Sequence, residues 1–204
     1  MAARVTTILN RLEKAYGPVE TPEQWPVLDE LIATILSQAT TNKNSAAAFE
    51  ELRRRFPTWE SVRQAPTKRI ADAIRSAGLA DQKAPRIKAI LEQLFFERGE
   101  LSLEFLHDTP VETADRFLQS LPGVGPKTSA CVLLFACRKP ILPVDTHVHR
   151  VSQRLELIGP KTTEARAHVE LAGLVPASKV LAFHLQLIRL GRRTCTARNP
   201  DCEQ

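Results

Sequence analysis

Apolar residues recur along the chain at the spacing of one face of an α-helix. The pattern is clearest in three stretches, where apolar side chains return every three or four positions. These stretches are residues 28–35, 87–94 and 180–188. No stretch shows the alternation of polar and apolar residues that is typical of a half-buried strand. The pattern therefore predicts an all-α protein.

Prolines mark the breaks between the predicted helices. The segments Thr21-Pro22-Glu23-Gln24 and Thr109-Pro110-Val111-Glu112 each offer a capping threonine, a proline for the first helical position and an acidic or amide side chain soon after. We expect a helix to start at each segment. No internal repeat or low-complexity tract is visible. The chain is therefore expected to be a set of short helices joined at prolines.

The segment from Leu121 to Lys127 reads LPGVGPK and joins two predicted helices through a glycine turn. We expect Gly123 and Gly125 to adopt positive φ, so that the turn is tight and presents bare backbone N–H groups. The helix that begins near Lys127 adds its positive N-terminal end, which makes a phosphate the expected ligand. An ordinary helix–helix turn is the alternative on this pattern alone.

Lys127 and Asp145 are the candidate catalytic pair. Cations suit the C-terminal end of a helix, so a lysine in the first turn lies against the dipole, which disfavours the ammonium and leaves more of the nucleophilic amine. Asp145 follows after enough chain for one helix and a turn, so a carboxylate can return towards the amine. Because Asp145 also precedes an apolar helical pattern, a capping aspartate and a solvated lysine are the alternatives.

These features together resemble the endonuclease III family of DNA glycosylases, in which a helix-hairpin-helix precedes a catalytic lysine and an aspartate. The resemblance also covers Leu31 to Gln38, Gly78-Leu79, Lys83-Ala84 and Gly191 to Cys195. It implies an all-α, two-domain helix-hairpin-helix glycosylase fold with the active-site cleft between the domains. The implied domains are a six-helix domain at residues 21–139 and a second helical domain at residues 1–20 plus 140–204.

The resemblance implies a base excision repair enzyme. This enzyme would be a DNA glycosylase with abasic-site lyase activity that removes damaged bases, above all oxidised pyrimidines, from duplex DNA. Lys127 would attack the sugar C1′ and form a Schiff base that permits β-elimination, while Asp145 would stabilise the cationic sugar. One alternative is a monofunctional mismatch or adenine glycosylase, which uses an activated water. The other is a non-catalytic hairpin module that only binds DNA.

The resemblance also implies DNA contacts outside the hairpin. The family inserts side chains from two turns into the DNA stack, and Gln38 and Leu79 lie in these turns. Leu79 aligns cleanly, with a core leucine as the alternative, whereas an ungapped match puts Ala39 where endonuclease III has the inserted glutamine. His147 matches the family's Val-Asp-Thr-His, which favours a DNA-facing role. His147 and His149 would point to different sides of a helix and make a poor metal pair.

The four cysteines form two pairs with different expectations. Cys131 and Cys137 lie in an apolar helix without sharing a face, so we expect buried thiols. Cys195 and Cys202 match the first two ligands of the family's 4Fe-4S loop, and the chain stops at Gln204, immediately before the third is due. The resemblance therefore implies a truncated iron-sulfur loop, with a cluster in the full-length protein and none, or an incomplete one, in this chain. Loss of the cluster is the alternative.

Composition and charge agree with this interpretation. The chain has 204 residues, 43% of them hydrophobic, which is enough for a folded core. A formal net charge of +5 and a pI of about 9.2 fit a polyanion, here double-stranded DNA with a damaged base or an abasic site. The N-terminal residues allow a transit helix, but the acidic Glu13 favours a surface helix. Because no apolar run approaches the roughly 20 residues of a membrane span and the N-terminus lacks a signal-peptide apolar core, we expect a cytoplasmic protein. We also expect it to be prokaryotic, nucleoid-associated and a monomer.

Overall fold

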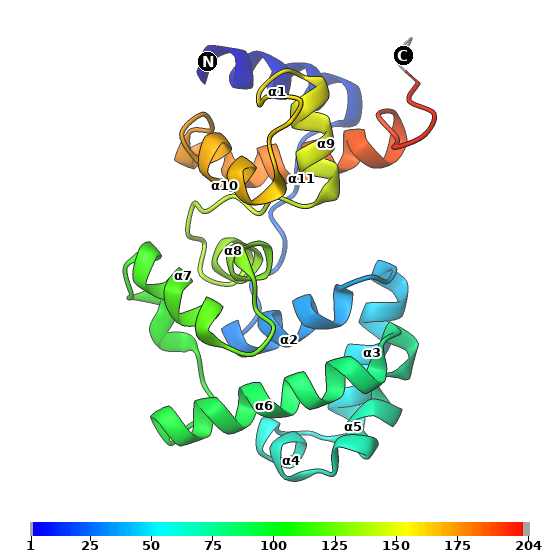
Figure 1. The fold of residues 1–204 in the computed structure, drawn as a ribbon, viewed down its shortest axis with the longest axis vertical. Coiled ribbons are helices and arrows are strands. Elements are labelled where there is room, and N and C mark those ends of the chain that lie inside the picture. Colours follow the sequence, from blue (N-terminus) through cyan, green and yellow to red (C-terminus); the bar gives the residue numbers. More distant parts are fainter. Residues whose placement is uncertain (1, 202–204) are drawn as a thin grey trace. The chain divides into compact units, whose positions relative to one another are not determined.

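The computed structural model describes residues 2–201, and this part of the chain contains helices and no strand (Figure 1). The all-α prediction is confirmed. The chain forms two compact units. The first runs from Gln24 to Cys137 and is called the hairpin unit here; the second, the terminal unit, combines the chain up to Glu23 with the chain from Arg138 onwards. The sequence predicted the division a few residues away, at residues 21 and 139.

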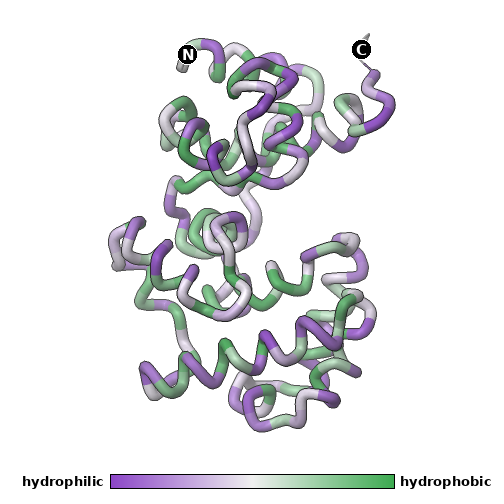
Figure 2. The backbone as a smooth tube through the Cα atoms, viewed as in Figure 1, coloured by the Kyte–Doolittle hydropathy of each residue, from purple (hydrophilic) through white to green (hydrophobic). Residues whose placement is uncertain are grey.

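The hairpin unit is built on two helices whose apolar stripes match the predicted pattern. Leu31 and Ile35 of α2 are fully buried, as are Ile87 and Leu91 of α6. Along α6, hydrophobic and hydrophilic residues alternate with the helical period (Figure 2). The helix α2 packs against α3, α6 and α8. The elements are α2 Val27–Ser37, α3 Asn42–Arg55, α4 Trp59–Gln64, α5 Thr67–Ala73, η1 Arg75–Ala77, α6 Ala80–Arg98, η2 Glu104–His107, α7 Val111–Ser120 and α8 Pro126–Phe135.

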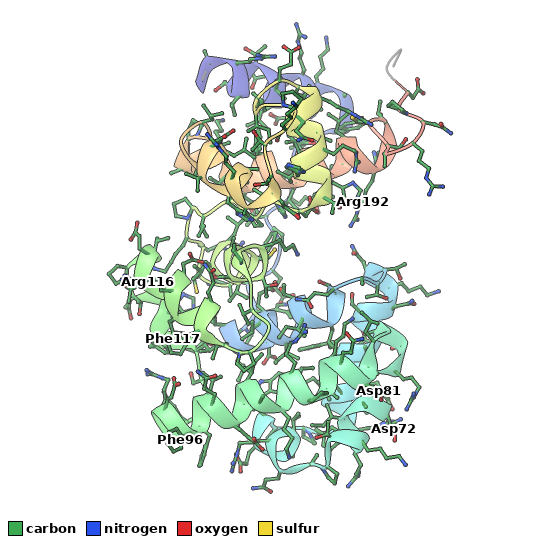
Figure 3. The ribbon with its side chains drawn as sticks, in the orientation of Figure 1. Asp72, Asp81, Phe96, Arg116, Phe117 and Arg192 are labelled. Carbon is green, nitrogen blue, oxygen red and sulfur yellow. The ribbon has the colours of Figure 1, made fainter. Side chains whose placement is uncertain are left out.

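Aromatic packing joins η2 to α7, the helix that leads into the glycine turn. The rings of Phe105 and Phe117 meet edge to face, with their centroids 5.2 Å apart. The Arg98 guanidinium lies over the ring of Phe105, 3.6 Å from its centroid. Phe117 therefore faces its own unit, whereas Phe96 on α6 is 90% exposed (Figure 3).

A helix begins at one of the two predicted segments, although with a different cap, and no helix begins at the other. At Thr109-Pro110, the proline takes the N-cap position of α7 with φ −53° and ψ 143°, and no described side chain caps the helix. The Thr109 hydroxyl donates instead to the preceding turn, to the carbonyl oxygen of Phe105 at 2.8 Å. The segment at residues 21–24 is not helical, because α2 begins only after Pro26, which has the same extended conformation. Each proline fixes the entry to its helix from outside.

The terminal unit packs helices from both ends of the chain together. In α1, Val5, Leu9 and Leu12 are nearly or fully buried, as expected of an amphipathic surface helix. The helix α11 contacts both α1 and α9.

Within residues 2–201 no single helix is long and apolar enough to span a membrane, although α10 and α11, bent by 120°, pass that test as a pair. The elements are α1 Ala2–Tyr16, α9 Thr146–Arg154, α10 Glu164–Ala172, η3 Ala177–Lys179 and α11 Val180–Arg193.

Candidate active site

The helices α7 and α8 and the turn between them form a helix-hairpin-helix (Figure 1). Leu121 and Val124 are 2% and 6% exposed and anchor the turn in the core. Gly123 has φ +71°, as predicted, and a Cβ at this position would overlap the side chain of Arg86. The left-handed backbone therefore favours glycine at residue 123, and a side chain at this position would also displace the flexible end of Arg86.

Gly125 differs from Gly123 in its backbone. Its φ of −99° and ψ of 178° are extended, so the prediction of positive φ was wrong here. The reason is that Gly125 is the N-cap of α8, a position that takes extended conformations. No described side chain caps this helix, and a Cβ on Gly125 would meet no described atom within 4 Å. The N-terminal end of α8 is therefore open to a phosphate.

Lys127 is the second residue of α8, in the first turn as predicted. The next two residues fix this turn. The Thr128 hydroxyl accepts a hydrogen bond from the Gln38 side-chain amide at 3.2 Å. The Ser129 hydroxyl donates to the Asp115 carboxylate at 2.6 Å. Thr128 and Ser129 are 5% and 0% exposed, whereas Lys127 is only partly buried. The helix is thus held on both sides while the lysine keeps access to solvent, as a positioned nucleophile requires.

Asp145 is the N-cap of α9, as the sequence pattern predicted. Its Oδ1 accepts a hydrogen bond from the backbone N–H of Val148 at 2.7 Å. This cap holds the carboxylate at the N-terminal end of the helix, where a negative charge is favourable. Because a carboxylate has two oxygens, the cap leaves the group able to interact with a second partner. Lys127 belongs to the hairpin unit and Asp145 to the terminal unit, and their meeting is part of the proposal below.

The two turns predicted to insert side chains into DNA both contain a left-handed residue with a side chain. Ala39 has φ 53° and Leu79 has φ 50°, and both are exposed, Leu79 by 50%. The alternative of a core leucine is therefore wrong. The Gln38 side chain is engaged within the protein, since it donates to Thr128 and accepts from Arg86 at 3.2 Å. Insertion of Gln38 into DNA would require both bonds to break, and its DNA role stays a prediction.

The two histidines of α9 make separate contacts within the terminal unit. His149 contacts the carbonyl oxygen of Thr162 at 2.7 Å, whereas His147 Nδ1 lies 3.1 Å from the Arg150 guanidinium. Arg150 also donates to the carbonyl oxygen of Gly191 at 2.8 Å. His147 is therefore held against α11 by a neighbour, and a DNA-facing role for it stays a prediction.

The cysteines do not form a metal centre among the described residues. Cys131 and Cys137 are buried, as predicted. The Arg154 guanidinium donates to Cys195 Sγ at 3.2 Å, and Cys202 lies outside the described residues. Within residues 2–201 there is no group of three or more side chains that would hold a metal ion. A 4Fe-4S cluster takes four thiolates, so the two cysteines of this segment do not fit it by themselves.

Arg86 and Thr128 are site residues that the sequence analysis did not single out. Both contact Gln38, and Arg86 also packs on the hairpin glycine. Their partners lie 48 and 90 residues away along the chain, so no local pattern could have indicated them.

Comparison with known proteins agrees with this architecture. Residues 32–177 match the family model described as HhH-GPD superfamily base excision DNA repair protein. The chain is 34% identical over 174 residues to endonuclease III of Thermotoga maritima, a match covering 85% of this chain and 77% of that protein. It is 44% identical over 155 residues to a protein of Arabidopsis thaliana, covering 76% of this chain but only 53% of the relative. The chain thus spans about half the length of that relative.

Solved structures show the same fold. A non-covalent endonuclease III–DNA complex matches with a TM-score of 0.83 and 26% identity, covering 100% of this chain and 92% of that one. A thermostable thymine-DNA glycosylase matches with a TM-score of 0.76 and 25% identity, covering 98% and 89% of the two chains. The chain therefore belongs to the HhH-GPD superfamily of base excision DNA repair proteins and is similar to endonuclease III within it.

Proposed function

We propose that this protein is a DNA glycosylase with associated abasic-site lyase activity, acting in base excision repair. The observation that carries the proposal is Lys127, a partly buried lysine in the first turn of a helix that follows a glycine hairpin. A phosphate bound at the open N-terminal end of α8 would bring the DNA backbone next to this amine. The endonuclease III relatives and the DNA complex of endonuclease III support the same activity.

The chemistry follows from these groups. A damaged nucleotide leaves the stack, and the Lys127 amine forms a bond to C1′ as the bond from C1′ to the base breaks. A proton passes from the amine to the Asp145 carboxylate and on to the departing base, and the carboxylate stabilises the cationic sugar. Opening of the sugar ring gives a Schiff base. Transfer of a proton from C2′ to water then expels the 3′ phosphate, and hydrolysis of the Schiff base by water releases the nicked strand and restores the Lys127 amine.

The products of cleavage test this function against its two rivals. Duplexes with an oxidised pyrimidine, a mismatch or an abasic site are incubated with the protein, and the products are identified by mass spectrometry. A free base together with a β-elimination nick supports the proposal. A free base with an intact abasic strand would indicate a monofunctional glycosylase. Binding without any product would indicate a DNA-binding module.

We propose oxidised pyrimidines as the preferred bases and a monomer as the acting form. The endonuclease III relatives support the first, because the resemblance to that family implies such substrates. A thymine-DNA glycosylase among the similar structures makes a mismatch the competing substrate. The same duplex panel decides between them, and light scattering of the DNA complex gives the stoichiometry. We also propose that the protein acts at the nucleoid of a prokaryotic cytoplasm, which fluorescence microscopy of a tagged protein tests.

A 4Fe-4S cluster is proposed only for a longer form of the protein that adds cysteines after Gln204. Cys195 and Cys202 would then supply two of the four thiolates. The backbone around Cys195 is already held, because Arg150 donates to its carbonyl oxygen at 3.0 Å and Arg154 donates to that of Thr196 at 2.7 Å. Iron analysis of the longer form should find iron, and the present chain should be metal-poor; equally low iron in both would contradict the proposal.

A further inference from the structure

Lys83 is a buried lysine that the chemistry above does not use. It is only 2% exposed, and its ammonium donates to three backbone carbonyl oxygens, those of Leu36 at 2.8 Å, Gln38 at 2.8 Å and Ala77 at 2.9 Å. An ammonium has three N–H donors, so every one is satisfied. Burial, and then the nearby Arg86 charge, lower the pKa of Lys83 from its usual value. The three carbonyls are therefore what keeps this cation inside the protein.

The three carbonyls belong to two separate turns. Leu36 and Gln38 lie at the C-terminal end of α2, immediately before Ala39, and Ala77 ends η1, two residues before Leu79. Carbonyls at the end of a helix lack partners within it and carry partial negative charge, so a cation suits them. The backbone N–H of Lys83 also donates to the carbonyl oxygen of Leu79 at 2.9 Å. One residue is thus bonded to both turns.

The same two turns hold an unfavourable backbone conformation. Ala39 and Leu79 both have positive φ, 53° and 50°, although each has a Cβ. Such residues persist where the surrounding structure enforces them, and they are frequent at ligand-binding sites. The Lys83 ammonium bonds to the carbonyl oxygen of Gln38, directly before Ala39, and to that of Ala77, two residues before Leu79.

We propose that Lys83 is a positioning residue that sets the spacing of the Ala39 and Leu79 turns, so that both enter the DNA at the extruded nucleotide. The inference rests on the proposed glycosylase function and adds a residue to it. Lys83 does not touch the reacting atoms, since all three of its N–H groups are taken by the protein. It therefore acts on the step that opens the duplex and not on the covalent chemistry of Lys127.

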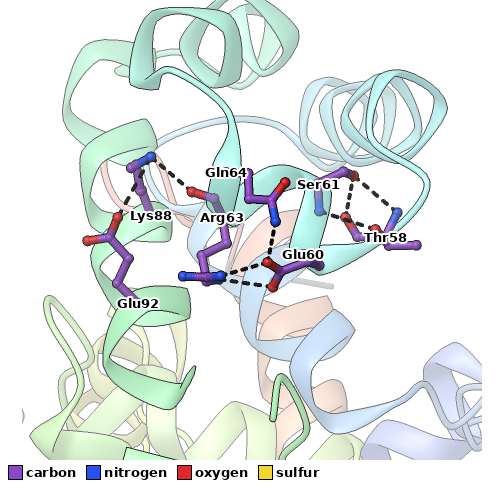
Figure 4. Close-up of polar contacts among 7 residues, drawn as sticks. All are labelled: Thr58, Glu60, Ser61, Arg63, Gln64, Lys88 and Glu92. Atoms are coloured by element: carbon purple, nitrogen blue, oxygen red, sulfur yellow. Dashed lines mark hydrogen bonds and ion pairs between the residues drawn. The ribbon is translucent and has the colours of Figure 1, made fainter. Parts of the chain in front are cut away.

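Lys83→Met tests this, because methionine keeps most of the side-chain length and removes the ammonium. The chain offers a matched control in Lys88, one turn further along α6. The Lys88 ammonium also donates to the backbone carbonyl oxygen of Arg63 at 2.9 Å and pairs with Glu92 (Figure 4). It donates as well to the carbonyl oxygen of Ala65 at 2.8 Å. It holds the α4–α5 connection and neither of the two turns, so Lys88→Met removes a comparable clamp elsewhere.

Two substrates separate positioning from chemistry. Base release from a fully paired damaged duplex requires the nucleotide to be extruded, whereas nicking at a pre-formed abasic site requires little of this. Lys83→Met should slow base release by roughly 10- to 100-fold, the scale expected of a misplacement of about 1 Å, and leave nicking and borohydride trapping at the abasic site unchanged. Lys88→Met should leave both rates per folded molecule unchanged.

Three results would overturn the inference. If Lys83→Met slows base release and nicking at the abasic site equally, Lys83 supports the catalytic helix. If Lys83→Met and Lys88→Met slow base release equally, Lys83 is a general packing residue. An unchanged rate of base release would leave it no role. If Lys83→Met does not fold, Lys83→Arg keeps the charge but moves the donors and should show the same selective loss. If the wild type nicks neither substrate, the proposed function fails. Hydrogen exchange then tests separately whether Lys83 holds the two turns: Lys83→Met, and not Lys88→Met, should speed exchange at residues 38–41 and 78–80.

Discussion

The substitution Asp145→Asn separates the two roles assigned to Asp145. Its carboxylate caps α9 through the 2.7 Å bond from the backbone N–H of Val148, and in the proposed reaction it also stabilises the cationic sugar. Asparagine caps a helix about as well as aspartate but carries no charge. The variant should therefore fold normally and lose activity.

The magnitudes of the two effects are far enough apart to be measured. A lost N-cap costs about 1 kcal/mol, and Asp145→Ala should lower the melting temperature by about 2–4 °C for a chain of this size. Asp145→Asn should change it by less than this. Loss of a preorganised group at the reacting centre lowers the rate about 10²- to 10³-fold. Asp145→Asn should thus show the large rate effect with almost none of the thermal effect.

The assay is single-turnover base release from a damaged duplex, next to calorimetric melting of each variant. Thr163 gives the matched control, because it is the N-cap of α10 in the same unit and accepts from the N–H of Arg166 at 3.3 Å. Thr163→Ala should lower the melting temperature like Asp145→Ala and leave the rate unchanged. If Asp145→Asn keeps the wild-type rate while Asp145→Ala melts earlier, Asp145 is only a cap and the reasoning fails.

Three further predictions concern other residues. Leu79→Ala should slow base release from a duplex by about tenfold, or 1.4 kcal/mol, with little change in nicking at an abasic site. Because Leu79 is 50% exposed, the melting temperature of the variant should hardly change. An equal loss of activity on both substrates would refute the insertion role. Gly125→Ala should weaken DNA binding in fluorescence anisotropy while costing less than about 1 kcal/mol of stability. Gly123→Ala should cost about 1–2 kcal/mol of stability because it places an alanine in a left-handed conformation, and equal stability of the two variants would contradict this. Hydrogen bonds from Arg54 and Arg55 lower the pKa of Glu51 from 4.5 to about 2. The contribution of Glu51 to stability is therefore complete above pH 4.5 and is lost as the pH falls through 2. Glu51→Gln should reduce the acid dependence of the urea midpoint in that window at low salt, and an unchanged dependence would show that these ion pairs contribute nothing to stability.

The parts of the site that were predictable from the sequence are those that local chemistry determines. Gly123 and Lys127 stand in one short segment whose turn and helix start follow from residue type, and Asp145 directly precedes the helix that it caps. Gly125 shows the limit of this reasoning, because a glycine in a turn does not need positive φ when it is the first capping residue of a helix. The predicted threonine caps also failed, because a proline is the N-cap of both helices: Pro110 before α7, and Pro26, outside the predicted segment, before α2.

The remaining features depend on contacts between distant parts of the chain. Nothing in the local sequence indicates that Lys83 is buried, because its partners Leu36 and Gln38 are 47 and 45 residues away. Arg86 likewise reaches Gln38 over 48 residues. Periodicity predicts which face of a helix is apolar but not that a charged residue beside it will be buried on backbone carbonyls. Only the packing of α2 against α6 brings these groups together.

The most direct test of the proposed function is borohydride trapping on a duplex with an abasic site or an oxidised pyrimidine. A Schiff base is reduced to a stable covalent complex, whereas a reaction through activated water gives nothing to reduce. The account predicts a cross-linked complex whose modified peptide maps to Lys127, and no complex with Lys127→Ala although this variant still binds the duplex. A cross-link that maps to another lysine, or undiminished trapping in Lys127→Ala, would contradict it.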